Sequence, residues 1–207
     1  MTDERCIYLV RHGETAGESS IRYHGRNDVP LSELGEQQVA GLIPLVRELR
    51  LTALVHSPLD RACASARILL EGLQQAPGQI EEVADLSEIF FGDMEGLTAE
   101  EIQARCPAWY VEWQAGRATS FPGGESFAGF DQRVATAIKA VLARYPAGDL
   151  MVVAHKGIIK RALGALLDLS PEAVSELDPA LGSLTVLACG DAVRLQAWSL
   201  TASSDPE

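Results

Sequence analysis

The chain has 207 residues, of which 47% are apolar and 22% are charged, a composition typical of a soluble globular protein. Its formal charge of −12 at pH 7 argues against nucleic acid and anionic membranes as partners, because both require a basic surface. A small anionic substrate stays open, since arginines in a pocket can outweigh the acidic field of the whole chain.

The first residues and the cysteines bear on where the protein works. Residues 1–5 match neither a signal peptide nor a transit peptide, and no apolar stretch approaches the roughly 18 to 20 residues that span a bilayer. The four cysteines are scattered without a C-x-x-C pair, so they are expected to be reduced thiols. We expect a cytoplasmic protein in which residues 1–207 form a single domain.

Short apolar runs alternate with helical patterns along the chain, which predicts an α/β fold built from parallel crossover units. The expected strands are residues 6–10, 54–56, 80–83, 151–154, 184–189 and 193–198. Apolar residues recur at helical spacing over 33–49, 59–73, 127–144 and 158–167. Gly190-Asp191 separates the last two strands and predicts an antiparallel hairpin at one sheet edge. The whole pattern predicts a three-layer α/β/α fold with a mostly parallel central sheet of about six strands.

Two local signals refine the helices. Pro44 lies inside the helical pattern 33–49 and predicts a kink or a break there. The segment Thr98-Ala99-Glu100-Glu101 has the pattern of a capping box and predicts a further short helix that ends near Pro107.

Residues 91–126 form the least regular part of the chain, rich in glycine and carrying Trp109, Tyr110 and Trp113. Two interpretations stay open for this segment. It forms a lid-like excursion over a site, or its aromatic side chains pack against the main core.

Four segments with chemically useful side chains each lie just after an expected strand or in the loop beyond it. They are Arg11-His12-Gly13, Ser57 to Arg61, Glu88, and His155-Lys156-Gly157. In an open parallel sheet the carboxyl ends of the strands line one crevice, so we expect these segments to converge. Together they supply two histidines, two arginines and a carboxylate.

This set of side chains suits phosphoryl transfer, which needs cations around three oxygens, an in-line nucleophile and a proton donor for the leaving oxygen. Arg11 and Arg61 can offer bidentate forks to a phosphate. A neutral imidazole can attack phosphorus and form a phosphohistidine that water later hydrolyses. A carboxyl group can protonate the leaving oxygen and then deprotonate the incoming water.

The segment Leu-Val-Arg-His-Gly-Glu-Thr at residues 9–15 resembles the signature of the histidine phosphatase superfamily, also called the phosphoglycerate mutase-like family. The resemblance continues in order along almost the whole chain. Its further matching segments are 28–32 with Gly35 and Gln38, 57–62, 86–88 with Gly92, Glu95 and Gly96, 121–126, and 152–155. It implies a phosphoglycerate mutase-like fold and a phosphatase acting on a small phosphorylated metabolite.

The resemblance also implies roles for individual residues. His12 would be the phosphorylated nucleophile and Glu88 the general acid and base, while Arg11, Arg61 and His155 would hold the phosphoryl group. Three further residues fall among the family's substrate contacts: Thr15, Arg22 and Gly25. The family implies no metal and no cofactor, in agreement with four histidines that show no close ligand spacing.

Two positions depart from the family pattern. Glu18 stands where the family often has an asparagine that donates to phosphate, and a carboxylate there would repel the substrate. Lys156 follows the second histidine where a glycine is usual. We hypothesise that Lys156 pairs with Glu18 or supplies the missing phosphate contact. The alternative is that both are solvated surface charges.

Other functions were weighed against a phosphatase. A cofactor-dependent phosphoglycerate mutase shares the nucleophile, but those mutases are longer between the second arginine motif and the glutamate, where this chain has only 26 residues. Gly124 to Ala128 nearly fits a serine hydrolase elbow, but no strand precedes it and the last glycine is missing. A non-catalytic phosphate-binding relative remains an alternative, and an apolar stripe near the C-terminal hairpin leaves a homodimer open.

Overall fold

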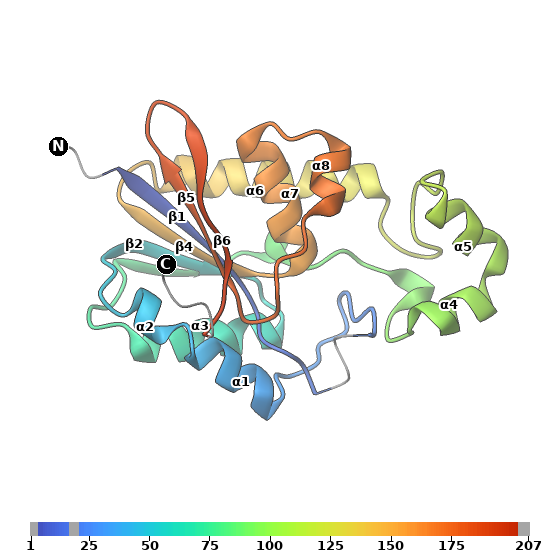
Figure 1. Ribbon diagram of the computed structural model, residues 1–207, viewed down its shortest axis with the longest axis horizontal. Helices are drawn as coiled ribbons and strands as arrows, with labels where there is room; N and C mark the ends of the chain where they lie inside the picture. Colours follow the sequence, from blue (N-terminus) through green and yellow to red (C-terminus); the bar gives the residue numbers. More distant parts are fainter. Residues whose placement is uncertain (1–3, 17–20, 203–207) are drawn as a thin grey trace.

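The computed structural model describes residues 4–16 and 21–202, and its centre is one six-stranded sheet (Figure 1). The strands are β1 (Arg5–Arg11), β2 (Leu51–His56), β3 (Gln79–Glu82), β4 (Asp149–Ala154), β5 (Leu184–Cys189) and β6 (Val193–Leu200). They lie in the order β3-β2-β4-β1-β5-β6. The pairs β3–β2, β2–β4 and β4–β1 are parallel, whereas β5 runs antiparallel to both β1 and β6. The predicted mostly parallel sheet with an antiparallel edge hairpin is confirmed.

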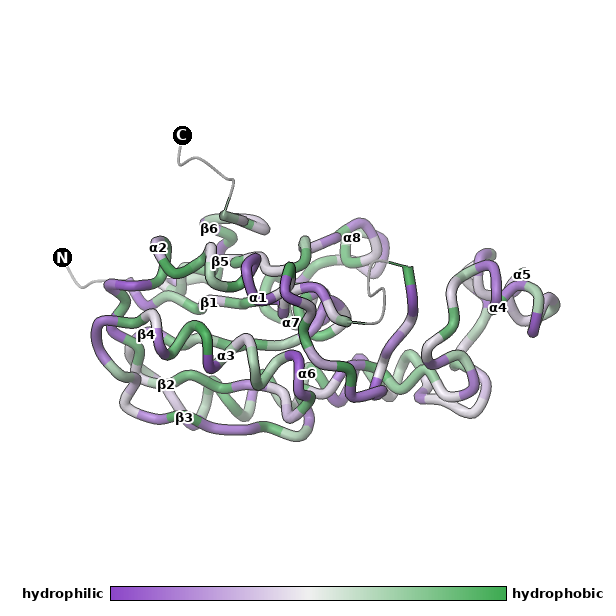
Figure 2. Tube along the Cα trace, turned by 90° about the horizontal axis from the view of Figure 1, so that it is seen from below, coloured by the Kyte–Doolittle hydropathy of each residue, from purple (hydrophilic) through white to green (hydrophobic). Residues whose placement is uncertain are grey.

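Helices cover both faces of the sheet (Figure 1). They are α1 (Glu33–Ala40), α2 (Ile43–Val46), α3 (Asp60–Gly72), α4 (Ala99–Arg105), α5 (Pro107–Gln114), α6 (Phe127–Arg144), α7 (Lys156–Leu167) and α8 (Pro171–Glu176). The first three lie on one face, and α6 and α7 on the other, which confirms the three-layer fold. Both views show α4 and α5 projecting beyond the end of the sheet (Figures 1 and 2). None of the helices in the described ranges is long and apolar enough to span a membrane.

The central strands β1 and β4 are apolar on both sides because each side faces a layer of helices. In β1, Ile7 and Leu9 belong to the core cluster shared with α6 and α7, while Tyr8 and Val10 belong to the cluster shared with α1 and α3. This alternation follows from the two-residue period of a strand. Parallel strands buried on both faces read as nearly continuous apolar runs, and this is why the sequence shows them clearly.

Capping side chains set the start of several helices, α1 and α4 among them. Ser32 Oγ accepts the N–H of Gly35 and begins α1. The predicted helix 33–49 is two helices, because it breaks before Pro44. The capping box of α4 is confirmed, with Thr98 and Glu101 each accepting the other's backbone N–H.

Two short helices, α5 and α8, were not predicted. Each begins with a proline at its first position, Pro107 and Pro171. Proline is well suited to that position because its missing N–H would have no partner in the first turn. The sequence pattern indicates Pro107 only as the end of the preceding helix.

Candidate active site

Three neighbouring strands deliver the central side chains to one place. Arg11 ends β1 and His12 follows it, Ser57 follows β2, and His155 follows β4. The ladder continues past the strand ends, since His12 N–H donates to Ala154 O at 3.1 Å and Ser57 N–H donates to Val153 O at 3.0 Å. The rings of His12 and His155 therefore lie edge to face with their centroids 5.1 Å apart.

The imidazole of His12 is oriented by its neighbour. Its Nδ1 lies 2.6 Å from the carbonyl oxygen of Gly13, which can only accept, so Nδ1 carries the ring proton. The lone pair is then on Nε2. Burial, followed by the charges of Arg61 and Arg11, holds the pKa of His12 well below its ordinary value. His12 is therefore a neutral imidazole with a free lone pair, the form that a nucleophile requires.

His155 is fully buried and is held by a serine. Its Nε2 lies 2.7 Å from Ser57 Oγ, which also accepts the N–H of Leu59 at 3.3 Å. The Ser57 hydroxyl proton can thus go to Nε2, which puts the ring proton on Nδ1. This Nδ1 is buried and has no hydrogen-bond partner in the described part of the chain. Burial, then Arg61 and His12, keep the pKa of His155 well below its ordinary value, so the ring is a neutral donor.

The buried guanidinium group of Arg61 and the partly buried one of Arg11 lie beside these rings. Arg61 donates to Asn27 O at 2.9 Å and to Gly25 O at 2.6 Å, so the loop that follows β1 fixes its position. Arg11 donates from Nη1 to Pro179 O at 2.7 Å, while its buried Nε has no partner among the described residues. Both arginines line the cleft described below and keep N–H donors for an anion.

The carboxylate of Glu88 is clamped by backbone. One oxygen accepts the N–H of Ile89 and the other accepts the N–H of Gly157, both at 2.9 Å. Gly157 lies in the first turn of α7, where backbone N–H groups have no partner within the helix. A Cβ at position 157 would lie 2.3 Å from Glu88 Oε1, which explains the glycine.

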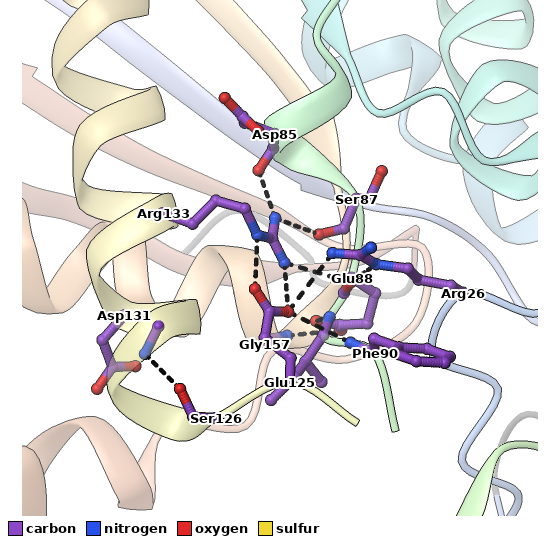
Figure 3. A network of polar contacts seen from close by, with 12 residues as sticks. Arg26, Asp85, Ser87, Glu88, Phe90, Glu125, Ser126, Asp131, Arg133 and Gly157 are labelled. Carbon is purple, nitrogen blue, oxygen red and sulfur yellow. Dashed lines mark hydrogen bonds and ion pairs between the residues drawn. The ribbon is translucent and has the colours of Figure 1, made fainter. Parts of the chain in front are cut away.

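Arg133 on α6 fixes the backbone that leads into Glu88, as Figure 3 shows. Its Nη1 donates to Asp85 O at 2.6 Å and to Ser87 O at 2.9 Å. It also forms a two-pronged ion pair with Glu125, with N–O distances of 2.9 and 2.8 Å. Glu125 N–H in turn donates to Phe90 O at 2.8 Å. The sequence interpretation missed Arg133 and Ser57; Ser57 stands within a matching segment, whereas Arg133 resembles any polar residue of an amphipathic helix.

These side chains open onto a cleft of about 1160 Å³. Its lining includes eight of the ten predicted site residues: Arg11, His12, Thr15, Arg22, Gly25, Arg61, Glu88 and Lys156. His155 lies buried behind His12, and Glu18 lies outside the described residues.

The predicted substrate contacts differ in what they can offer. Gly25 has a left-handed φ of 54° and presents its carbonyl to Arg61, so it acts through its backbone. Arg22 donates to Gly96 O and to Glu101, both at 2.8 Å, which ties it to α4. Thr15 is buried at the cleft wall.

Lys156 lies at the rim of the cleft and its Nζ is 2.6 Å from Asp178 Oδ1. Its ion-pair partner among the described residues is thus Asp178, which the sequence does not indicate. The suggested pairing with Glu18 falls on a residue outside the described ranges.

The irregular segment supplies an aromatic wall to the same cleft. From this segment the wall takes Phe91, Trp113 and Phe121, and it is completed by Tyr23 from the loop after β1 and by Phe127 at the start of α6. Within the segment, Trp109 and Trp113 stack with centroids 5.5 Å apart, and Trp109 Nε1 donates to Ser120 O. Trp109 and Tyr110 also pack against the main core. The aromatic side chains therefore pack together and border the site as well.

A buried neutral imidazole has a lone pair here, and two guanidinium groups, a second imidazole and a fixed carboxylate surround it; this arrangement has the chemistry that a phosphate group needs. Comparison with known families agrees, since residues 7–201 match the model of the histidine phosphatase superfamily (branch 1). The chain belongs to this superfamily.

Known relatives place the chain among phosphatases of this superfamily. It is 34% identical over 166 residues to the adenosylcobalamin/alpha-ribazole phosphatase of Salmonella typhimurium, covering 78% of this chain and 79% of that protein. It is also 30% identical over 167 residues to the uncharacterized phosphatase PhoE of Bacillus subtilis, covering 81% and 80%. Among solved structures, a mycobacterial glucosyl-3-phosphoglycerate phosphatase complexed with VO3 superposes with a TM-score of 0.80 at 28% identity, covering 94% of this chain and 98% of that one.

Proposed function

We propose that this protein hydrolyses small phosphomonoesters through a phosphohistidine on His12, without a metal ion at the reacting phosphate. The observation that carries the proposal is the Nδ1 contact of His12 with Gly13 O at 2.6 Å. It directs the lone pair of Nε2 away from the backbone, beside Arg11 and Arg61. The phosphatase names of the relatives support the same reaction class.

In the first step, His12 Nε2 forms a bond to phosphorus as the bond from phosphorus to the ester oxygen breaks. A protonated Glu88 gives its proton to the departing oxygen. Arg11, Arg61 and the Nδ1–H of His155 take up the charge that develops on the phosphoryl oxygens.

In the second step, Glu88 removes a proton from a water molecule that attacks the phosphohistidine. The P–N bond breaks and inorganic phosphate leaves, which returns His12 to its neutral form. The same carboxylate serves both steps. Its fixed position between Ile89 N–H and Gly157 N–H therefore supports both the protonation of the leaving oxygen and the deprotonation of water.

We propose a small phosphorylated metabolite with a bulky leaving group as the substrate. The cleft of about 1160 Å³ exceeds what a phosphate alone would fill, and its outer part carries the aromatic wall. We assign residues 91–126 to the same single domain and propose that they cover the leaving group. The relatives are named for substrates as different as alpha-ribazole phosphate and glucosyl-3-phosphoglycerate, so the wall is where substrate choice would differ.

Hydrolysis of p-nitrophenyl phosphate tests the proposal. The wild type should hydrolyse it with equal rates before and after treatment with a chelator, and His12→Ala should lose the activity. Mass spectrometry of a rapidly quenched reaction should detect a phosphoryl group on His12. Thermal unfolding serves as the control that His12→Ala still folds. A wild type inactive on all phosphomonoesters would overturn the enzymatic proposal and favour a phosphate-binding relative.

A further inference from the structure

A second group of chemically reactive side chains lies outside the cleft, at the β2–β3 edge of the sheet. His56 ends β2, Glu82 ends β3, and Cys63 is in the first turn of α3. His56 and Glu82 are paired in the parallel register of the two strands, so their side chains leave the sheet together. One nitrogen, one sulfur and one carboxylate oxygen from these residues all lie within 4.8 Å of one another.

The sulfur–nitrogen distance matches that of a zinc site. With Zn–S of about 2.3 Å and Zn–N of about 2.0 to 2.1 Å, a tetrahedral angle separates sulfur and nitrogen by about 3.6 Å. Cys63 Sγ and His56 Nδ1 are 3.6 Å apart. Thiolate, imidazole and carboxylate together are a donor set that zinc accepts, whereas magnesium and calcium prefer oxygen alone.

The electrostatic surroundings also favour a cation. The carboxylates of Glu82, Asp60 and Asp28 act electrostatically on the sulfur of Cys63. Three negative groups around one sulfur disfavour a bare thiolate but attract a divalent ion, which would stabilise that thiolate. With a net charge of −12, the chain has many other carboxylates that attract cations. This cluster differs from them because it also offers a soft sulfur ligand.

We propose that His56, Cys63 and Glu82 bind a zinc ion, with a water molecule as the fourth ligand. Binding forms Zn–S, Zn–N and Zn–O bonds and releases the thiol proton of Cys63 to solvent. His56 Nδ1 now lies 2.9 Å from Ser57 O and therefore carries a proton, which must move to Nε2 before Nδ1 can bind the metal. The net release is one proton for each zinc ion bound.

The zinc site would join β2, β3 and α3 at the sheet edge formed by the short strand β3. β3 has four residues and pairs only with β2 within the sheet. A metal held by β2, β3 and α3 would fasten this strand, because a ligand that binds only the folded state stabilises it. The metal would take no part in phosphoryl transfer, since none of its three ligands lines the catalytic cleft.

Cobalt(II) gives a direct test, because a Co²⁺–thiolate bond produces a charge-transfer band that carboxylates and imidazoles do not. Reduced, chelator-treated protein should show this band with Co²⁺ and lose it when Zn²⁺ is added. Cys63→Ser should abolish the band, whereas Cys106→Ser, at another partly buried cysteine, should keep it. His12→Ala should also keep it, which separates this site from metal bound by the catalytic histidines.

Calorimetry with Zn²⁺ supplies the second measurement. The wild type should bind one zinc ion and release one proton, seen as a dependence of the heat on the buffer, and should unfold at a higher temperature with zinc. Glu82→Gln changes an exposed side chain, so it should fold normally and bind zinc about tenfold more weakly. A missing charge-transfer band, a band that survives Cys63→Ser, or equal zinc affinity in wild type and Cys63→Ser would overturn the proposal.

Discussion

Ser57 is the only described residue whose side chain contacts His155 Nε2, so Ser57→Ala tests how the second histidine is held. The substitution removes the 2.7 Å contact with Nε2 and the acceptor for Leu59 N–H at 3.3 Å. The buried Nε2 of His155 and the partly buried N–H of Leu59 then lack this partner, which should lower the free energy of unfolding by about 1 to 3 kcal/mol. The ring of His155 also loses what keeps its proton on Nδ1. If about 1.4 to 2.8 kcal/mol of transition-state stabilisation is lost, kcat/KM falls about 10- to 100-fold.

Ser65→Ala is the matched control. Ser65 is likewise fully buried, and its hydroxyl donates to Arg61 O at 2.7 Å without reaching either histidine. Both variants should lose stability in urea unfolding, but only Ser57→Ala should lose kcat/KM towards p-nitrophenyl phosphate. Unchanged kinetics in Ser57→Ala, or an equal loss in Ser65→Ala, would refute the link between Ser57 and catalysis.

The carboxylate and the buried histidines give two further predictions. Glu88→Gln cannot donate a proton to the leaving oxygen, so kcat should fall about 10²- to 10⁴-fold on an alkyl phosphate. The fall should be clearly smaller on p-nitrophenyl phosphate, whose leaving group departs without a proton; equal losses on both substrates would contradict the acid role. His12 and His155 have pKa values below their ordinary 6.5, so under about pH 6.5 the unfolded chain binds more protons than the folded one. The free energy of unfolding should therefore fall on acidification from pH 7 to 5.5, by up to about 1.4 kcal/mol per pH unit for each histidine. Urea unfolding at pH 7 and at pH 5.5 measures this change. An equal free energy of unfolding at the two pH values would mean that the rings are charged in the folded protein.

The sequence predicted the central layer well because its signals are local. Strands buried on both faces are continuous apolar runs, and α6 was predicted with its observed bounds, 127–144, because its apolar face repeats regularly after the Ser126 cap. The convergence of His12 with His155 followed from one topological rule about the carboxyl ends of parallel strands.

Contacts between distant side chains were not predictable in the same way. Arg133 reaches the carbonyl of Asp85, and Lys156 reaches Asp178, only because the fold brings separate helices and loops together. Nothing local in the sequence signals such a partner. The role of Gly157 was equally hidden, since its N–H and its missing Cβ matter only beside Glu88.

In the proposed mechanism, the start of α7 holds two groups that act on the substrate. His155 precedes the helix directly, and Gly157 in its first turn clamps Glu88. A small rotation of α7 would therefore displace His155, which donates a hydrogen bond to the phosphoryl group, together with Glu88, which carries the proton. Under the proposed mechanism, substitutions along the buried side of this helix would slow the formation and the breakdown of the phosphohistidine in parallel, so the fraction of enzyme held as the intermediate would stay nearly constant while turnover declined.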